Sequence, residues 1–573
     1  MHRPAASLAL ALAGLAASAP AAADPHCAPA MSIHQLELEA HRGEPPALRR
    51  PLPAAAARAR TLSRVVYGYY PYWVAGLDGI QWDRLTHLAW FALELDGTGA
   101  IVDAHGWPDA ATVAAAHAAG VRVDLTFTLF SGDGIRALLG DPARRGAAIT
   151  AMVDQLEAGG ADGISIDFEG FPDGSRDPFT AFIGELRSAL EARGHVGAGI
   201  SIAVPAVNGG GADGIPEIDT RGLLAHADYL FIMGYGYFWS GSAHAEPVGL
   251  LRLTPAWREV SRSSSQRSIA AYAVEAGAAG RRQLVFGVPY YGREWITADD
   301  QPRSAAVESV GALPYSRAVD GRAVRAPRWD ADISQAWYTW MDSTGWHQVW
   351  FDDADSLAAR YQMIVEQDLG GVGVWALNYD RPRAELWQLL ALSFSGEPPP
   401  VPGDRRAPLV IDRLPFSDAR STATGPGNYF DRYGCSDADE YGREWVYRVD
   451  LAAAGHLTAR VDSDPGADID IHLLSALDEA ACLARGDRSL GAELAAGTYH
   501  LVADTFARDG VTAEGGFRLA VDVGPPGSGA DAGAEPGDDR AGCGCAGGGA
   551  DAGGALAPVL IAAVGASLRR RRS

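Results

Sequence analysis

Residues 162–169 read DGISIDFE, an alternation of polar and apolar side chains that is typical of a β-strand with two different faces. Because successive side chains of a strand point to opposite faces, Ser165, Asp167 and Glu169 share one face, and the apolar residues between them are suited to packing under helices. Asp167 and Glu169 would lie about 6 to 7 Å apart along the strand. In a partly dry site each carboxylate disfavours ionisation of the other, so one can stay protonated and act as an acid. Taken alone, the pair could equally be a solvated acidic turn after a strand.

Similar apolar runs recur between residues 64 and 395 and alternate with helical stretches such as Ala147–Ala158 and Phe179–Ala192. The eight expected strands are Val65–Tyr70, Leu85–Leu93, Val121–Leu129, Gly163–Phe168, Gly199–Val204, Tyr229–Tyr235, Leu284–Val288 and Val372–Leu377. Eight strands with helical crossovers predict an α/β fold of the (β/α)8, or TIM-barrel, type. Glu169 would then stand at the carboxyl end of its strand, where the active sites of such barrels form. The long gap before the last strand predicts a small inserted α+β subdomain at about residues 296–347.

The segment 162–169 resembles the D-G-x-D-x-D-x-E signature of glycoside hydrolase family 18, the chitinase-like family, and the resemblance extends over roughly residues 64–395. Met233-Gly234-Tyr235 is similar to the family's M-x-Y-D on strand six, and residues 287–293, GVPYYGR, are similar to its G-x-P-x-Y-G-R on strand seven. Trp375 falls where the family has a tryptophan under the sugar. One such match would be weak, but four in the family's order make the resemblance specific.

The resemblance implies an O-glycosyl hydrolase, a chitinase or endo-N-acetylglucosaminidase, that cleaves β-1,4-linked N-acetylglucosamine glycans, either chitin or peptidoglycan, with retention of configuration. In this family the substrate's own acetamido carbonyl is the nucleophile. Glu169 would be the general acid, Asp167 would orient the acetamido group, and the Tyr235 hydroxyl would bind its carbonyl. The Trp375 ring would form the floor of the sugar site. Further substrate contacts are expected from Tyr72, Trp73, Met233, Tyr291 and Arg293, and support of the catalytic pair from Asp162 and Ser165.

Structural alternatives and departures from the family pattern qualify these roles. Tyr235 could be a core tyrosine of the barrel, and Arg293 could pair with a loop carboxylate. Ser165 stands where many chitinases have an Asp, and Gly236 stands where the strand-six motif ends in Asp. A polar, non-acidic residue at position 165 resembles the spore-cortex and peptidoglycan-acting branch, and we expect activity with an altered specificity or pH profile. The alternative hypothesis is a non-catalytic glycan-binding lectin or adhesin on the same barrel, against which the retained Glu169 weighs.

The composition excludes some classes of partner. The formal net charge is −23, and nucleic acid demands clustered positive charge, so we expect no nucleic-acid partner. A neutral polysaccharide substrate makes no such demand. The five cysteines and 14 histidines show no metal-ligand spacing, so neither a metal nor a cofactor is predicted. Oxygen ligands gathered among Asp462, Asp464, Asp468 and Asp470 leave a calcium site as the alternative to a solvated acidic loop.

Both ends of the chain are expected to direct it to the outside of the cell. Residues 1–23 have a basic start, an apolar run and a small-residue end, which predicts a signal peptide, and residues 24–63 are interpreted as a spacer with a helix near Met31 to His41. A Gly/Ala/Asp tether at 524–553 leads to a Cys-hydrophobic-Arg tail, 543–573, that resembles myxobacterial surface-sorting tails. We expect a secreted or cell-surface protein on the bacterial envelope exterior, attached through the tail, with a plain weak membrane anchor as the alternative.

A second folded domain is expected after the barrel. Residues 396–408 are rich in proline and predict a linker. From 409 to 523, short alternating strands separated by Gly and Asp turns predict an all-β sandwich. Its segments 468–474 and 497–501 resemble the pre-peptidase C-terminal domain of secreted bacterial enzymes, which leaves open whether the domain binds a surface or only spaces the enzyme from it. Its only cysteines are Cys435 and Cys482, and we expect a disulfide between them in an oxidising envelope.

Overall fold

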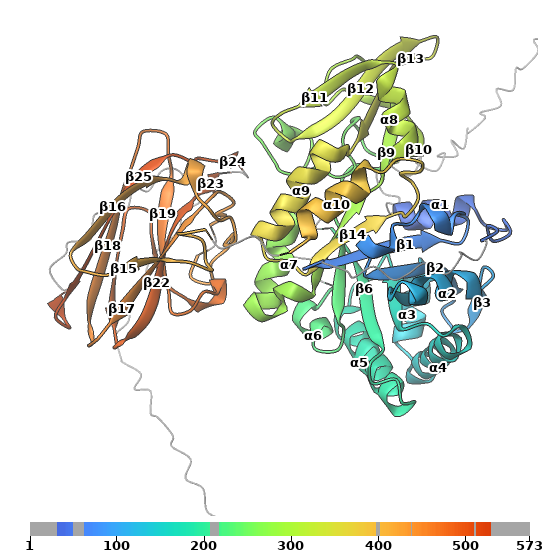
Figure 1. The fold of residues 1–573 in the computed structure, drawn as a ribbon, viewed down its shortest axis with the longest axis horizontal. Coiled ribbons are helices and arrows are strands. Elements are labelled where there is room, and N and C mark those ends of the chain that lie inside the picture. The colour runs from blue at the N-terminus through green and yellow to red at the C-terminus, as the bar shows by residue number, and fades with distance from the viewer. Residues whose placement is uncertain are drawn as a thin grey trace, which may run out of the picture. The chain divides into compact units, whose positions relative to one another are not determined.

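The computed structural model describes residues 31–49, 62–206, 217–396, 401–436, 438–508 and 511–528. Within these ranges eight parallel strands form a barrel in the order β1-β14-β8-β7-β6-β5-β4-β2, closed by the pairing of β1 with β2 (Figure 1). Their bounds are β1 Val65–Pro71, β2 His87–Leu95, β4 Arg122–Leu129, β5 Gly163–Phe168, β6 Gly199–Pro205, β7 Tyr229–Met233, β8 Leu284–Pro289 and β14 Gly371–Trp375, with the short antiparallel β3 Ile101–Asp103 beside β2. Each expected strand is present, so the predicted TIM-barrel class is confirmed.

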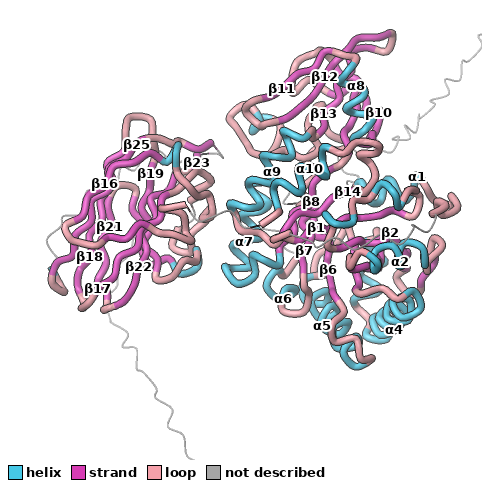
Figure 2. Tube along the Cα trace, in the orientation of Figure 1, coloured by secondary structure: helices cyan, strands magenta, loops and turns pink. Residues whose placement is uncertain are grey.

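Helices follow most barrel strands and cover them from outside (Figure 2). Their bounds are α2 Ala110–Ala118, α3 Gly132–Leu139, α4 Pro142–Gly159, α5 Arg176–Ala192, α6 Thr220–Leu224, α7 Ser265–Gly280, α9 Ala354–Glu366 and α10 Glu385–Phe394. The sequence around α4 carries the signals that start and stop a helix. Asp141 caps the first turn, Pro142 occupies the first helical position, and Gly160, with φ 68°, ends the helix in the left-handed conformation that glycine adopts easily.

The segment before β14 forms its own antiparallel sheet, in the order β10-β9-β13-β12-β11. The bounds are β9 Tyr291–Thr297, β10 Ala306–Pro314, helix α8 Tyr315–Ala323, β11 Ala326–Asp330, β12 Gln335–Asp342 and β13 Gly345–Phe351. The insert therefore runs from 291 to 351 rather than over the predicted 296–347, because the GVPYYGR motif passes directly from β8 into β9. Trp337 and Trp350 stack with ring centroids 4.6 Å apart in the core of the insert.

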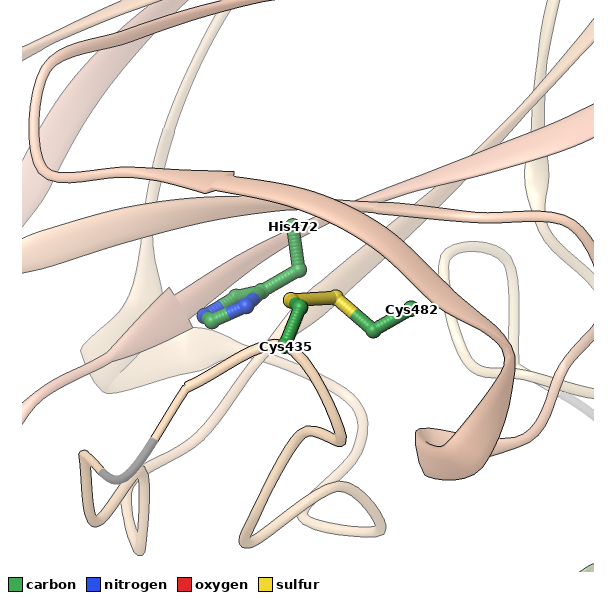
Figure 3. A group of neighbouring side chains, drawn as sticks. All are labelled: Cys435, His472 and Cys482. Carbon is green, nitrogen blue, oxygen red and sulfur yellow. A yellow bond between two sulfur atoms is a disulfide. The ribbon is translucent and has the colours of Figure 1, made fainter. Parts of the chain in front are cut away.

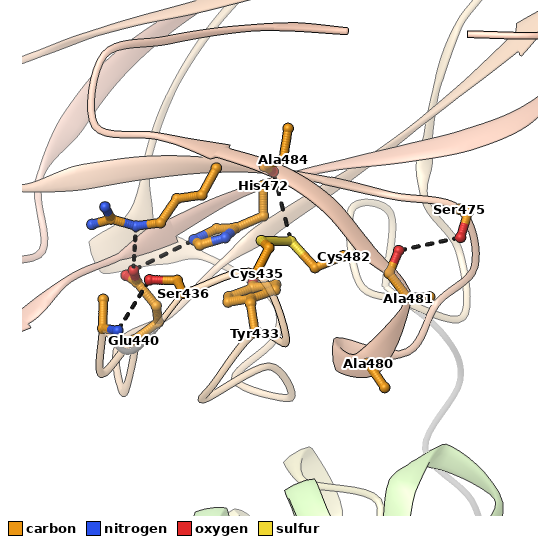
Figure 4. Close-up of a disulfide and its surroundings, with 12 residues drawn as sticks. Tyr433, Cys435, Ser436, Glu440, His472, Ser475, Ala480, Ala481, Cys482 and Ala484 are labelled. Atoms are coloured by element: carbon orange, nitrogen blue, oxygen red, sulfur yellow. Dashed lines mark hydrogen bonds and ion pairs between the residues drawn. A yellow bond between two sulfur atoms is a disulfide. The ribbon is translucent and has the colours of Figure 1, made fainter. Parts of the chain in front are cut away.

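The region after the linker is a β-sandwich, as predicted. One sheet has the order β15-β17-β22-β19-β20 and the other β16-β25-β18-β21. The bounds are β15 Leu409–Ile411, β16 Phe416–Ser421, β17 Trp445–Leu451, β18 Gly455–Ser463, β19 Ile469–Leu474, β20 Cys482–Gly486, β21 Ser489–Leu494, β22 Gly497–Thr505 and β25 Gly516–Gly524, with a short pair β23 Ala507–Arg508 and β24 Val511–Thr512. Cys435 and Cys482 form a disulfide with an S–S length of 2.02 Å (Figure 4).

Residues 31–49, interpreted as part of a spacer, instead pack on the barrel. The expected helix is present as α1, Ile33–Ala40, and the Ser32 hydroxyl caps it by accepting a hydrogen bond from the Gln35 N–H at 3.0 Å. Leu38 is 1% exposed and belongs to the same apolar core as the barrel strands. The spacer interpretation is therefore wrong for this stretch, because its side chains find partners on the barrel.

Among the described residues, no helix is both long and apolar enough to cross a membrane. The predicted signal peptide at 1–23 and the predicted tail at 543–573 lie outside the described residues, as do residues 397–400 of the linker and most of the predicted tether.

Candidate active site

Asp167 and Glu169, the last two carboxylates of the DGISIDFE segment, stand at the carboxyl end of β5. Asp167 lies in register with Thr128 of β4, and the N–H of Glu169 donates to the Leu129 carbonyl at 3.2 Å. Between the carboxylates, Phe168 packs on two phenylalanine rings of α5. The alternation of the strand therefore directs both carboxylates away from the helical layer. The Asp167 side chain is fully buried and that of Glu169 is 14% exposed.

This environment alters the acidity of Glu169. Burial is the main cause that raises its pKa to about 8, and the neighbouring Asp167 carboxylate acts in the same direction. His34 and a hydrogen bond from Ser32 act in the opposite direction. Glu169 therefore keeps its proton at neutral pH, which is the state that a general acid needs. Within the described part of the chain, Asp167 Oδ1 has no hydrogen-bond partner, so it can accept a donor from a ligand.

Tyr235 and Trp375 complete the group and come from two other strands. Tyr235 follows the end of β7 and is 5% exposed, while Trp375 is the last residue of β14 and is fully buried. Burial holds the pKa of Tyr235 well above its ordinary value, and the hydroxyls of Tyr69 and Tyr291 add to this effect. The Tyr235 hydroxyl is therefore a neutral group that can donate a hydrogen bond.

A polar layer lies beneath the carboxylate pair. The Ser165 hydroxyl is 3.3 Å from the hydroxyl of Tyr69, and the Tyr67 hydroxyl donates to Asp124 Oδ2 at 2.9 Å. Burial raises the pKa of Asp124. Sequence reasoning missed Asp124, although its place on the same face of β4 as Thr126 and Thr128, between apolar neighbours, is a signal for a buried polar contact. Ser165 thus supports the site through Tyr69, whose own pKa is raised by burial and by Asp167.

Side chains from the N-terminal segment lie directly against these groups. The Ser32 hydroxyl donates to Glu169 Oε1 at 2.7 Å. The His34 Nδ1 atom lies 2.8 Å from Asp167 Oδ2, and Nε2 lies 2.8 Å from the Tyr235 hydroxyl. The His34 ring stacks on Trp375, with 3.8 Å between ring centroids. Asp167, Glu169, Tyr235 and Trp375 therefore surround one space, and a side chain of the same protein fills it.

Glu37 makes a further set of contacts one helical turn later. Its Oε2 accepts hydrogen bonds from Trp375 Nε1 at 2.9 Å and from the Tyr379 hydroxyl at 2.8 Å. Desolvation raises the pKa of Glu37 to about 7, although these hydrogen bonds lower it. Sequence reasoning missed Ser32, His34, Glu37 and Tyr379. The available signal was the polar, capped helix SIHQLELE ahead of the first barrel strand.

The aromatic residues after β1 also contact the N-terminal segment. The Tyr72 hydroxyl donates to the His41 carbonyl at 2.7 Å, and the Trp73 ring stacks on the His41 ring at 4.7 Å. Arg293 is 4% exposed, donates to the Ser309 hydroxyl at 3.2 Å and interacts electrostatically with Tyr291. The structure thus places Tyr72 and Trp73 around residues 31–49 rather than around the carboxylate pair.

Two predicted residues have structural surroundings. The Asp162 carboxylate accepts from the Val123 N–H at 2.8 Å and lies 2.8 Å from His117 Nε2, which places it at the start of β5, opposite the end that carries Glu169. Met233 is buried, and its carbonyl accepts from the Tyr235 N–H at 2.7 Å. Met233 therefore shapes the turn that carries Tyr235.

Several clusters of described residues have the side-chain types that bind metal ions. They are His34 with Asp167 and Glu169; Glu94 with Asp103 and His105; Glu440 with Asp470 and His472; and Cys435 with His472 and Cys482. The last cluster lacks thiolates because its cysteines form the disulfide (Figure 3). At the Glu440 cluster, Arg485 already supplies positive charge to Glu440 and Asp470, and Asp470 belonged to the calcium alternative. The absence of a metal and of a cofactor stays a prediction.

Comparisons with known proteins agree with the site. The sequence model of "Glycosyl hydrolases family 18" matches residues 65–380. The chain is 31% identical over 262 residues to YdhD of Bacillus subtilis (strain 168), which is named as a candidate sporulation-specific glycosylase. The aligned region covers 44% of this chain and 56% of that protein. The chain is 22% identical over 321 residues to the cortical fragment-lytic enzyme of Bacillus anthracis, covering 54% of this chain and 68% of the relative.

A solved structure shares the fold. The GH18 chitinase from Cycas revoluta, in complex with (GlcNAc)3, matches with a TM-score of 0.51 at 18% identity, over 57% of this chain and 99% of that one. The chain spans little more than half the length of the first of these relatives. The family match itself extends over more than half of the chain and contains Asp167, Glu169, Tyr235 and Trp375. The chain belongs to glycosyl hydrolases family 18.

Proposed function

We propose that this protein hydrolyses β-1,4-linked N-acetylglucosamine glycans, with Glu169 as the general acid. The observation that carries the proposal is the convergence of Asp167, Glu169, Tyr235 and Trp375 on one space. Glu169 supplies a carboxylic acid with a raised pKa, and Asp167 supplies a second carboxyl group beside it. Tyr235 supplies a neutral hydroxyl donor, and the ring of Trp375 supplies an aromatic floor. A sugar with an acetamido group offers a matching acceptor, donor and apolar face.

The reaction proceeds in two steps. Protonated Glu169 gives its proton to the glycosidic oxygen while the acetamido carbonyl oxygen attacks the anomeric carbon, so the C–O bond to the leaving sugar breaks as a cyclic oxazolinium forms. Asp167 accepts a hydrogen bond from the acetamido N–H and stabilises the positive charge of the oxazolinium ring. The Tyr235 hydroxyl donates a hydrogen bond to the attacking oxygen. Water, deprotonated by Glu169, then opens the ring. Two inversions at the same carbon leave its configuration retained.

Two polymers, chitin and peptidoglycan, are the candidate substrates. The names of two relatives refer to sporulation and to cortex fragments, and other relatives carry chitobiase or chitinase names. Ser165 stands in place of an acidic residue, and its resemblance to the spore-cortex and peptidoglycan-acting branch favours a peptidoglycan substrate over chitin. Both polymers contain the N-acetyl group that the mechanism needs.

Product analysis tests this function. The full chain and a variant with Ser32→Ala and His34→Ala, which removes the side chains that fill the site, would each be incubated with chitotetraose and with peptidoglycan sacculi. We expect fragments that end in a reducing N-acetylglucosamine by mass spectrometry, and none when Glu169→Gln is added to the same background. Binding of chitotetraose or sacculi, with cleavage of neither in either background, would replace the hydrolase with the glycan-binding lectin or adhesin.

We also propose that the enzyme works outside the cell, secreted or on the bacterial surface. The signal-peptide pattern of residues 1–23, the sorting-tail pattern of residues 543–573 and the Cys435–Cys482 disulfide support this location. The β-sandwich would act as a pre-peptidase-type domain that holds the enzyme near its polymer. Cell fractionation followed by amino-terminal sequencing tests the location: an uncleaved chain found only in the cytosol would contradict it.

A further inference from the structure

We infer that residues 32–37 occupy the acetamido-sugar site as an intramolecular inhibitor, so that the full chain is latent until the segment is displaced. This inference rests on the proposed function and concerns the regulation of the same site. Asp167, Glu169 and Tyr235 are expected to face the substrate. They instead contact Ser32 and His34, which precede the barrel in the sequence.

The imidazole of His34 matches the hydrogen-bonding pattern of an acetamido group. In the tautomer with a proton on Nδ1, that N–H donates to Asp167 Oδ2, as an acetamido N–H would. Nε2 then accepts from the Tyr235 hydroxyl, as an acetamido carbonyl would. The flat ring stacks on Trp375 with an interplanar angle of 28°, as an apolar sugar face would. One side chain therefore engages three of the four groups.

Ser32 engages the fourth group. Its hydroxyl oxygen lies 2.7 Å from Glu169 Oε1, where a leaving-group oxygen would lie, but it donates a hydrogen bond to the carboxyl instead of accepting the proton. The same hydroxyl caps α1 by accepting from the Gln35 N–H. The helix cap and the contact with the acid are thus made by one atom, so docking of the segment and formation of the helix stabilise each other.

Contacts after His34 hold the rest of the described N-terminal stretch, as far as Arg49, on the barrel. Glu37 accepts from Trp375 Nε1 and from the Tyr379 hydroxyl, and the His41 ring stacks on Trp73. Further along, Arg49 forms an ion pair with Asp109 and donates to the Pro71 carbonyl at 2.7 Å. A brace that only stabilised the barrel would not need to bury polar side chains against the catalytic carboxylates, since such burial is favourable only with matched partners.

The covalent connection makes this inhibitor hard to displace. A segment that is covalently attached near its own binding site has an effective concentration of about millimolar order. A soluble substrate therefore competes with a segment that dilution cannot remove. The apparent affinity for substrate then falls by the fraction of molecules in which the site is open. Loss of the two docking side chains therefore raises kcat/KM by about tenfold or more.

The test compares three full-length chains on a chromogenic chitobioside: wild type, Ser32→Ala/His34→Ala, here called the released variant, and the control Gln35→Ala/Glu39→Ala. The control removes a hydrogen-bonded pair on the solvent side of the same helix, 3.0 Å between Gln35 Nε2 and Glu39 Oε1. We expect kcat/KM to rise about tenfold or more in the released variant and to stay at the wild-type value in the control. Thermal unfolding shows that each chain is folded.

A second measurement does not depend on turnover. In the Glu169→Gln chain, chitotetraose should speed amide hydrogen exchange across Ile33–Ala40, because the sugar displaces the helix. Equal kcat/KM in wild type and the released variant, with both active, would overturn the inference and leave the proposed function intact. Failure of every chain to cleave or bind the chitobioside, chitotetraose and peptidoglycan sacculi would overturn the proposed function and this inference with it.

Discussion

The Nδ1 atom of His34 lies 2.8 Å from Oδ2 of Asp167, although 133 residues separate them in the sequence. Both side chains are fully buried, so the contact replaces water that would otherwise solvate the carboxylate. The electrostatic state of the site in the full chain therefore depends on the N-terminal segment as well as on the barrel. Variants of the barrel carboxylates and variants of the N-terminal residues can therefore separate the effect of the carboxylates on activity from the effect of docking.

Glu169→Gln should stabilise the protein at neutral and alkaline pH. The pKa of Glu169 is raised from 4.5 to about 8 in the folded chain, so its contribution to stability is present in full below about pH 4.5 and is lost as the pH rises through about 8. Glutamine cannot ionise and avoids this loss. We expect the Tm of the variant to equal that of wild type near pH 4 and to exceed it by about 2 to 4 °C near pH 8, by differential scanning fluorimetry. Exposed Glu39→Gln is the control, and a pH-independent difference in Tm would contradict the prediction.

Docking of the N-terminal segment should weaken as the pH rises. Glu37 is held by Trp375 Nε1 and the Tyr379 hydroxyl, and the titratable groups that lower its pKa electrostatically are His41, the C-cap residue of α1, and Arg293 on β9. Its pKa is raised from 4.5 to about 7, so the docked segment gains stability below pH 4.5 and loses it as the pH rises through about 7.

The measurement is the ratio of kcat/KM in the released variant to that in the wild type. This ratio should fall between pH 4.5 and about 7 as ionisation of Glu37 opposes docking. Glu37→Gln, introduced into both chains, should flatten that part of the curve because glutamine keeps its hydrogen-bonding shape and carries no charge. A curve that keeps the same slope in the Glu37→Gln pair would show that other groups control docking.

The disulfide should stabilise the β-sandwich without affecting catalysis. It joins residues separated by 47 positions, and closing a loop of that length in the unfolded chain corresponds to about 4 kcal/mol. We expect Cys435→Ser/Cys482→Ser to lower the denaturant midpoint of the β-sandwich, and a reducing agent to have the same effect on wild type. As a control, Cys435→Ser/Cys482→Ser added to the released variant should leave its kcat/KM unchanged. Equal midpoints for oxidised and reduced wild type would contradict the prediction.

The barrel and its carboxylate pair were predictable because their signals are local. Alternation in DGISIDFE fixes the faces of Asp167 and Glu169, and the barrel strands are short segments rich in apolar residues. The boundary of the insert was less accurate, since residues 291–293 extend the sheet of the insert while the motif that contains them begins in a barrel strand. The local sequence pattern does not show at which residue the chain leaves the barrel sheet and enters the sheet of the insert.

The filled site could not be predicted from local pattern. Helix α1 has a cap and a helical sequence, and these features indicate only that it is a helix. Its partners Glu169, Tyr235 and Trp375 follow it by more than a hundred residues, and pairing of that kind depends on the closed barrel. The alternation of hydrophobic residues says which face is buried but not that a histidine will be buried against a carboxylate.

The Tyr235 hydroxyl should act in the transition state rather than in ground-state binding. Tyr235→Phe in the released variant removes the donor to the attacking oxygen, and loss of one such donor costs about 100-fold in kcat. Because the interaction strengthens as the ring forms, kcat and kcat/KM should fall together while KM stays close to its original value. Tyr237→Phe is the matched control, since that hydroxyl lies 2.9 Å from the Ser268 hydroxyl instead. If Tyr235→Phe left kcat unchanged and only lowered Tm, the side chain would be a core tyrosine of the barrel, and the charge on the oxazolinium would have to be stabilised by Asp167 alone.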